Sequence, residues 1–407
     1  MATRPLSRPY LWHALALLLV LAILLAEFAY MSQAPLLSDE SFNFRQISRF
    51  VRRDFSMEPL MNVIPGYHAL VALILVAAGK KGAFSARLVS TAISAGTVIL
   101  FYLLTWKVYA RPSIIRTLQF AFLPLFFPYF SLIYTDVLAM FLVLAAFYLA
   151  LEGRYTLAGL VGMLSVLART NNIAWFAFLY AFIYYDLCGL EIRQFIPSLR
   201  QTWIFWSGFV LFLIFLIYNG GIAIENKTTQ PLFKFETGNL SFILFVFALL
   251  FLPLIVANLP HLVRLVTVRR WILPLTLLIC GGLFIVYHNT HVYNNVSPEI
   301  FLRNGLLMRM VADFPLRAAY FAVVAFSLLN LAAMPLVQKR FYWLYPFTIL
   351  SLIPFWLIEP RYYFVPLSLF LLFRTERQAW SEWLQVAYGV VFSFVLLYYI
   401  RSVTIFI

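Results

Sequence analysis

Charged residues are scarce in this chain, and their scarcity indicates which solvent surrounds it. They make up 11% of the 407 residues, whereas a soluble domain carries about 25%. With 63% hydrophobic residues and a mean hydropathy of +0.89, the chain cannot cover itself with polar surface. Apolar runs of about 20 residues recur, without the alternation of apolar and polar positions that is typical of a transmembrane β-barrel. The sequence therefore predicts an all-α, multi-pass membrane protein.

Cysteines and glycine-rich motifs are also few, which excludes several kinds of site. Cys188 and Cys280 lie in or beside apolar runs, so neither a disulfide framework nor a cysteine metal site is predicted. His288 and His291 share a loop without acidic or cysteine neighbours, which makes a weak metal site. The sequence contains neither a P-loop nor a dinucleotide-binding glycine fingerprint. We therefore expect no metal, no cofactor and no nucleotide donor handled on the cytosolic side.

Basic residues outnumber acidic ones, 30 to 16, which gives a net charge of +14. The chain has no soluble basic domain, so nucleic acid is not an expected partner. Most Lys and Arg residues lie between apolar runs, where anchoring to anionic lipid headgroups explains them. Binding of a lipid-linked phosphate by a few of them is the more specific alternative.

The apolar runs predict a transmembrane bundle of about 13 to 14 spans that forms one domain over residues 1–407. Arg4 and Arg8 place the start of an uncleaved first span, Tyr10–Tyr30, in the cytosol. The polar loop over residues 31–62 then lies outside and predicts an outer layer of loops and juxtamembrane helices. No internal repeat is visible, which weighs mildly against a secondary transporter.

Two segments decide on which side every later loop lies. Val63–Gly79 is expected to be the second span, which places Lys80, Lys81 and Arg87 in a cytosolic turn. Ile114–Ile133 is apolar enough to cross, but prolines interrupt it, and we expect it to be re-entrant or interfacial. On this interpretation, most acidic residues lie outside: Asp39, Glu40, Asp54, Glu58, Asp136, Glu225, Glu236, Glu299, Asp313 and Glu359.

Four polar clusters carry the candidate chemistry, and each has a structural alternative. Asp39-Glu40 can deprotonate a substrate hydroxyl, or it can cap a helix and pair with nearby arginines. Tyr134-Thr135-Asp136 places an acid between apolar runs, where it is costly unless paired or hydrated, but it can also be a helix N-cap. Arg169-Thr170-Asn171-Asn172 is either a tight turn or a phosphate site. Glu359-Pro360-Arg361-Tyr362-Tyr363 offers either an internal ion pair or phosphate recognition.

The same clusters resemble the motifs of a known family. Asp39-Glu40-x-Phe42-x-x-x-Gln46, with Glu58-Pro59 and Pro65-Gly66-Tyr67, resembles the first luminal loop of the dolichyl-phosphoglucose-dependent α-1,2-glucosyltransferases of the GT-C superfamily. Four further motifs follow in the same order over nearly the whole chain: Phe127-Pro128 to Tyr134-Thr135-Asp136, Arg169-Thr170-Asn171-Asn172-Ile173, Asn219-Gly220-Gly221-Ile222 with Glu225 and Lys227, and Arg361-Tyr362-Tyr363 with Pro366.

The chain departs from this family at several positions. Asn43 stands where the family usually has His, Thr170 where it has Gln, and Glu225 where it has Asp. The family's Asp-Asn-Arg-His-Tyr motif is not found, and only Arg303-Asn304 offers a counterpart. These departures bear on the acceptor more than on the type of reaction.

The resemblance implies a set of site residues. Asp39 and Glu40 are implied as catalytic, with Asp39 as the general base. The implied contacts to the donor phosphate and sugar are Arg361, Arg169, Asp136, Tyr134, Asn172, Arg303 and Tyr362. The implied contacts to the acceptor are Asn43, Gln46, Glu58 and Glu225.

The resemblance also implies a reaction, its partners and a location. The reaction is inverting transfer of glucose from a polyprenyl (dolichyl) phosphate donor to a hydroxyl of a lipid-linked glycan, with an α-1,2 linkage as product. The active site would face the ER lumen or, in a prokaryote, the periplasm, and membrane lipids surround the chain. A GT-C transferase of another sugar, mannose or arabinose, is one alternative. A transporter or lipid scramblase is another, and it predicts charges near the middle of the membrane.

Overall fold

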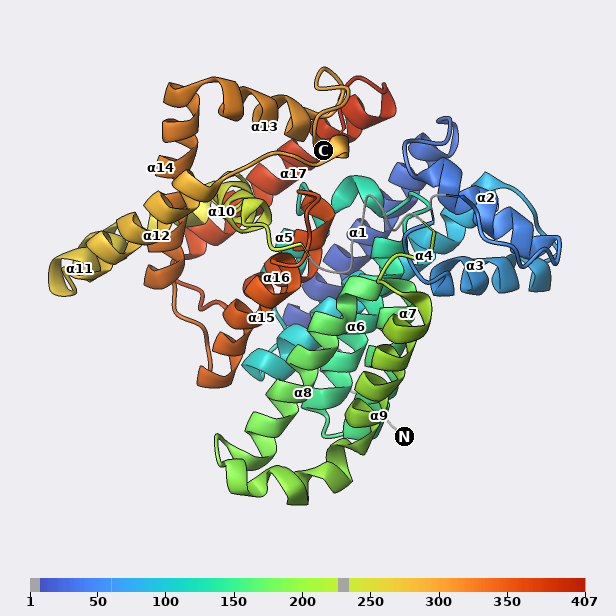
Figure 1. Ribbon diagram of the computed structural model, residues 1–407, viewed down its shortest axis with the longest axis horizontal. Coiled ribbons are helices and arrows are strands. Elements are labelled where there is room, and N and C mark those ends of the chain that lie inside the picture. Colours follow the sequence, from blue (N-terminus) through green and yellow to red (C-terminus); the bar gives the residue numbers. More distant parts are fainter. Residues whose placement is uncertain (1–7, 60, 226–233, 407) are drawn as a thin grey trace.

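The computed structural model describes residues 8–59, 61–225 and 234–406, and within these ranges the protein is helical (Figure 1). The bounds of the α-helices are α1 Arg8–Ser32, α2 Glu40–Val51, α3 Gly66–Ala77, α4 Ala83–Tyr109, α5 Ile114–Ala121, α6 Thr135–Leu151, α7 Tyr155–Ala168, α8 Ile173–Cys188, α9 Phe195–Asn219, α10 Gly238–Leu250, α11 Leu252–Val268, α12 Ile272–Val286, α13 Leu302–Ala312, α14 Phe314–Ala333, α15 Leu344–Leu352, α16 Phe364–Phe373 and α17 Ala379–Arg401. The prediction of an all-α, multi-pass membrane protein is confirmed.

The long spans are fewer than the predicted 13 to 14. In the described ranges, five helices are long and apolar enough to cross a membrane: α1, α4, α9, α14 and α17. The pair α10–α11 adds a sixth if the 98° bend between them is counted within one span. Other apolar helices, such as α3 and α6, have 12 and 17 residues. At about 1.5 Å per residue, α3 is about 18 Å long and falls short of the roughly 30 Å hydrocarbon core, whereas α6 comes near it, so an apolar run of sequence was not always a full crossing.

The expected second span is instead part of a hairpin with α2. Helix α3 packs along α2, and Figure 1 shows the two together at one edge of the molecule. Arg87, in the first turns of α4, donates hydrogen bonds of 2.6 and 2.9 Å to the carbonyls of Met31 and Ala34, at the end of α1. The chain therefore leaves α1 and enters α4 at the same end of the bundle. The prediction that Lys80, Lys81 and Arg87 lie on the side opposite to residues 31–62 was wrong.

The segment Ile114–Ile133 was expected to be re-entrant or interfacial, but it runs from one end of the bundle to the other. Its start lies at the far end of α4, where the Arg116 guanidinium is 4.4 Å from the ring of Tyr109. Its end lies at the beginning of α4, where the Ile133 amide donates to Glu40, the ion-pair partner of Arg87. The segment therefore runs the length of α4 as helix α5 followed by turns, and it is not re-entrant.

One expected crossing is absent and one unexpected crossing is present. The later loops therefore lie on the sides that were predicted. We call the end of the bundle that holds Arg87 and residues 31–62 the site end. At the opposite end, buried Arg374 pairs with Glu382 and donates to Oε1 of Gln119 at 2.8 Å. Lys107, at the end of α4, pairs with Glu152 after α6, so α6 returns to that opposite end.

Aromatic side chains fill the space between the helices. Phe147 on α6 packs against Phe182 on α8, and Phe341 stacks on Phe373 with ring centroids 4.1 Å apart. Edge-to-face and offset contacts of this kind add to the burial of apolar area. These contacts join α6 to α8 and the end of α16 to the segment before α15.

Candidate active site

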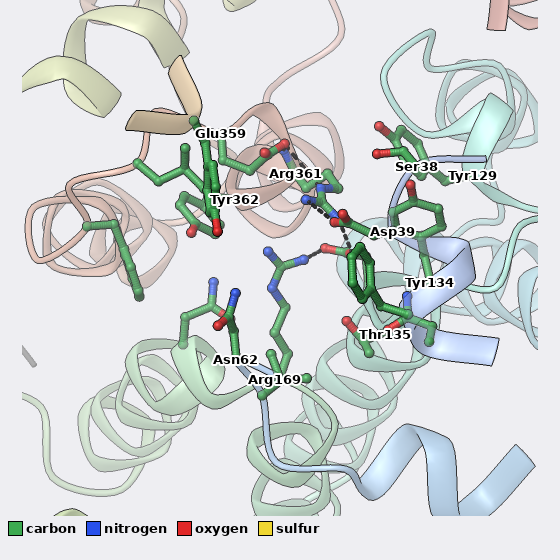
Figure 2. A pocket seen from close by; sticks show the side chains of 18 of the residues that line it. Ser38, Asp39, Asn62, Tyr129, Tyr134, Thr135, Arg169, Glu359, Arg361 and Tyr362 are labelled. Atoms are coloured by element: carbon green, nitrogen blue, oxygen red, sulfur yellow. Dashed lines mark hydrogen bonds and ion pairs between the residues drawn. The ribbon is translucent and has the colours of Figure 1, made fainter. Parts of the chain in front are cut away.

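A cavity of about 430 Å³ opens at the site end (Figure 2). Its walls come from segments far apart in sequence: 38–43, 61–63, 129–136, 169–171, Ile222, 293–303, 355–362 and Phe406. Three carboxylates and three arginines line it: Asp39, Asp136, Glu359, Arg169, Arg303 and Arg361. In a chain with so little charge, this concentration marks the cavity as the candidate site.

Asp39 is the carboxylate most open to the cavity. It precedes α2, but its side chain makes no capping hydrogen bond to that helix, so the capping alternative is not supported. The side chain is 46% exposed and its Oδ2 lies 2.9 Å from Nη2 of Arg361. A substrate hydroxyl can therefore reach the carboxylate, and Arg361 holds it in place.

Glu40 points the other way, although it is the next residue. It is fully buried and forms an ion pair with buried Arg87 at 2.6 Å. It also accepts hydrogen bonds from the amides of Leu37 and Ile133, each at 2.9 Å. Glu40 does not line the cavity. Together with Arg87, Glu40 connects α1, α2, α4 and the turn before α6. These bonds hold the loop that carries Asp39.

Asn43, Gln46 and Glu58 were predicted to contact the acceptor, but they form hydrogen bonds and ion pairs with other residues of the protein. Asn43 lines the cavity, but its Nδ2 donates to the Ile133 carbonyl and its Oδ1 faces Nε2 of His68 at 2.9 Å. Buried Gln46 accepts a hydrogen bond from the Glu58 amide at 2.6 Å. Glu58 pairs with Arg45 and Arg49 at 2.5 and 3.1 Å. Gln46 and Glu58 thus hold residues 52–59 against α2, outside the cavity wall.

Arg361 is the centre of the charge network. Its guanidinium contacts Asp39, Glu359 at 3.1 Å and Asp136 at 3.9 Å. Glu359 also pairs with Arg303 at 2.6 Å, so both structural and functional interpretations of the Glu359–Arg361 motif are compatible with the geometry. Burial raises the pKa of Glu359, but Arg303 and Arg361 outweigh it and lower that pKa to about 2. Glu359 is therefore a permanent anion between two cations.

Arg169 contributes a second cation from the end of α7. It pairs with Asp136 at the start of α6, and its guanidinium lies 5.2 Å from the ring of Tyr362. Burial, together with the nearby charge of Arg361, lowers the pKa of Arg169 to about 10, so it remains charged at neutral pH. The ring of Tyr134 lies across the cavity from Tyr362, 5.2 Å from the Arg361 guanidinium (Figure 2). Arg169 and Arg361 thus place two guanidinium groups between the rings of Tyr134 and Tyr362, an arrangement suited to binding a phosphate.

The remaining predicted residues lie outside the cavity. Asn172 is buried and its Nδ2 is directed at the carbonyls of Ala139 and Ser165. Glu225 is exposed, and its backbone amide donates to the Met61 carbonyl at 2.9 Å. Lys227, part of the same predicted motif, lies outside the described residues.

Several neutral residues of the cavity were missed by sequence reasoning. Asn62, Asn171, Tyr129 and Tyr293 line it, together with apolar Phe301. Asn62 and Tyr293 stand in none of the recognised motifs. Asn171 is inside the Arg169 motif, but only the fold shows that Asn171 rather than Asn172 faces the cavity.

Buried asparagines fix the loop that carries Glu359 and Arg361. Asn239 donates to the carbonyls of Phe355 and Leu357, and its Oδ1 accepts from the Glu359 amide at 3.2 Å. Asn294 bonds both the carbonyl and the amide of Ile358, each at 3.0 Å. These bonds replace the missing helix ladder of the loop and hold its arginine in position.

The ligands for a metal ion are not grouped in this site. Within the described ranges, no three His, Cys, Asp or Glu side chains gather closely enough to hold one. Each carboxylate of the cavity instead faces an arginine, so the positive charge available to a ligand comes from guanidinium groups.

Comparison with known proteins points to one family. Residues 33–194 match the model of the DIE2/ALG10 family, and these residues include Asp39, Asp136 and Arg169. The chain is similar to the Dol-P-Glc:Glc(2)Man(9)GlcNAc(2)-PP-Dol alpha-1,2-glucosyltransferase of Rattus norvegicus, with 22% identity over 86% of this chain and 85% of the relative. The enzyme of the same name from Drosophila melanogaster is 24% identical over 86% of both chains.

A third relative of that name, from Candida albicans, is 27% identical over 61% of this chain and 60% of its own. No solved structure matches the chain significantly. The resemblance to this glucosyltransferase family that the motifs predicted is confirmed.

Proposed function

We propose that this protein transfers glucose from a polyprenyl-phosphate donor to a hydroxyl of a lipid-linked glycan, with an α-1,2 linkage as product. One observation carries the proposal: a solvent-accessible carboxylate, Asp39, lies 2.9 Å from an arginine that shares its cavity with two more. A general base beside a phosphate recess is what such a transfer needs. The relatives named as Dol-P-Glc-dependent glucosyltransferases support the same reaction.

In the proposed reaction, Asp39 accepts the proton of the acceptor hydroxyl. The oxygen attacks the anomeric carbon from the face opposite the phosphate, and a new carbon–oxygen bond forms. The bond from the anomeric carbon to the phosphate oxygen breaks, and its electron pair leaves with the polyprenyl phosphate. Attack from the opposite face inverts the configuration, so a β-linked donor gives an α-linked product.

The arginines stabilise the charge that develops on the leaving phosphate. Arg361 and Arg169 line the cavity, and Arg303 lies behind Arg361 across Glu359. Because all three are already fixed by carboxylates, they need not reorganise as the phosphate gains charge. The proposed reaction uses these guanidinium groups and requires no metal ion.

The site end of the bundle is proposed to face the ER lumen or the periplasm. The first span enters from the cytosol by the sequence rule for basic flanks, and α1 ends at the site end. A lipid donor and a lipid-linked acceptor both reach such a site from the membrane plane.

A transfer assay in detergent tests the proposal. Purified protein receives labelled polyprenyl-phosphate glucose, mannose or arabinose with lipid-linked acceptors. We expect transfer from the glucose donor, and a fall of about 10²- to 10⁴-fold in kcat for Asp39→Asn, because loss of a general base costs that much. The matched control is Asp54→Asn, whose side chain is 50% exposed but lies outside the cavity.

The outcomes separate the candidate functions. Transfer only from mannose or arabinose would assign another sugar to the same site. No transfer from any donor would favour a transporter or scramblase. Full activity of Asp39→Asn would remove Asp39 as the base, whatever the sugar.

A further inference from the structure

Two asparagine side chains line the cavity without hydrogen-bond partners for their carbonyl oxygens. The Oδ1 atoms of Asn62 and Asn171 are both buried, and neither accepts a hydrogen bond from the protein. Buried polar atoms in native proteins are nearly always paired, so each exception needs a reason. The arginines of the proposed phosphate site do not donate to these two oxygens, because their guanidinium groups face carboxylates.

The packing of α3 against α7 brings these two amides to the same part of the cavity wall. Asn62 precedes α3 and Asn171 follows α7, and the two helices meet at Gly66. A Cβ atom at Gly66 would lie 2.6 Å from the carbonyl oxygen of Leu167, so only glycine permits this approach. Each asparagine lies four residues from that contact, on the cavity side of it. In Figure 2, Asn62 and Arg169 project from the same side of the cavity toward Arg361 and Tyr362.

An unpaired amide is suited to a sugar hydroxyl. A hydroxyl donates to the amide oxygen and accepts from the amide NH₂, so one asparagine satisfies it in both senses. An amide is also neutral, so it adds no charge beside a phosphate. Asn171 stands two residues from Arg169, and the transferred sugar is joined directly to the phosphate. Asn171 and Arg169 line the same cavity, so the asparagine lies where the sugar of a donor bound at Arg169 would be placed.

From these observations we infer that Asn62 and Asn171 form an amide subsite that recognises hydroxyl groups of the transferred hexose. The inference rests on the proposed function. The empty oxygens are the groups that the bound sugar satisfies, and a donor without the matching hydroxyl leaves an amide buried and unpaired. Discrimination against deoxy sugars follows from that penalty.

The test compares donors on one set of variants. Wild type, Asn62→Ala and Asn171→Ala receive polyprenyl-phosphate glucose and its 2-, 3-, 4- and 6-deoxy analogues. The readout is the ratio of kcat/KM for glucose to that for each analogue. We expect the wild-type ratio to be about 100 or more for at least one analogue. In each variant, the ratio for one hydroxyl position should fall at least tenfold. Asn172→Ala is the control, since this buried neighbour faces away from the cavity.

The control should lower the rates with all donors together and leave the ratios unchanged. Where an alanine variant does not purify as a folded protein, the near-isosteric and apolar Asn62→Leu or Asn171→Leu replaces it. Wild-type transfer with unchanged ratios in the variants would overturn the subsite and leave the proposed function standing. Absence of any transfer by wild type would overturn both.

Discussion

Arg361 joins the two halves of the proposed chemistry. Its guanidinium holds Asp39 at 2.9 Å and Glu359 at 3.1 Å, while its face lies against Tyr134. The proposed base and the proposed phosphate ligand are therefore in direct contact. A change at Arg361 would therefore disturb both parts of the proposed reaction at once.

Glu359→Gln tests the anion that fixes Arg303 and Arg361. The folded-state pKa of Glu359, about 2, lies below its ordinary value of 4.5. Its stabilising contribution is therefore fully present above pH 4.5 and is lost as the pH falls through about 2. At pH 7 we expect the variant to lose about 3–5 kcal/mol of stability, because buried Arg303 and partly buried Arg361 lose their shared partner. Unfolding in detergent at pH 7 and pH 3 measures the effect.

The difference between variant and wild type should shrink at pH 3. Glu299→Gln is the control, because Glu299 is exposed, and it should change stability by about 0.5 kcal/mol or less at either pH. An equal loss for Glu359→Gln at both pH values would contradict the assigned pKa.

At the residue scale, the sequence predicted much of the charged site. Asp39, Asp136, Arg169, Arg303 and Arg361 stand out because charge is rare in this chain, and all five line the cavity. The direction in which a side chain points was not predictable. The buried face of α2 is largely polar, with Glu40, Asn43, Gln46 and Ile47, whereas an apolar stripe would have been the expected inner face. Long-range partners such as Arg87 decide this, and spacing along the chain does not reveal them.

At the scale of elements, the meeting of α3 and α7 sets the shape of the cavity wall. Gly66 lies against the Leu167 carbonyl, and the segment before it continues to Met61, whose carbonyl accepts from the Glu225 amide. The wall is thus held from both sides. A small displacement of α3 would shift residues 61–63 relative to Arg169.

Gly66→Ala should therefore disturb both stability and transfer. The added methyl group would lie 2.6 Å from the Leu167 oxygen, and backbone must shift to relieve the contact. We expect a loss of about 1–3 kcal/mol in stability and a lower rate of transfer. Gly281→Ala is the matched control, because a Cβ atom there meets nothing within 4 Å. Thermal unfolding in detergent and the transfer assay measure both, and a Gly66→Ala protein equal to the control would contradict the packing described.

Helix type was predictable at this scale, but helix length was less so. The apolar runs became helices because their composition leaves them no other way to satisfy the backbone in lipid. Whether a run spans or folds back depends on packing between helices. The run at 63–79 had the composition of a span, yet it became a 12-residue helix lying against α2.

At the scale of the whole molecule, the corrected topology places residues 33–59 and 61–82 at the site end. In a background without Cys188 and Cys280, membrane-impermeant maleimide should label Phe55→Cys and Lys81→Cys from the same side of sealed vesicles, and Arg154→Cys from the other. Phe55, Lys81 and Arg154 are all exposed. Labelling of Lys81→Cys together with Arg154→Cys would restore the crossing by residues 63–79.

The overall membrane architecture was predictable from composition, whereas the path of the chain was not. Two topological errors compensated, so the loops that carry Asp39, Asp136, Arg169 and Arg361 were still assigned to one end. That agreement came from placing the basic turns near Arg193, Arg264 and Lys339 in the cytosol. It did not come from the span count, which the structure lowers to five or six long spans.

The six charges of the cavity sum to zero, since three arginines face three carboxylates at one end of the bundle. In the proposed reaction, the proton that reaches Asp39 and the charge that reaches the phosphate both stay within this end. No charge moves across the thickness of the bilayer during a turnover. The reaction would therefore draw nothing from the membrane potential, and its driving force is the chemical energy of the sugar–phosphate bond alone.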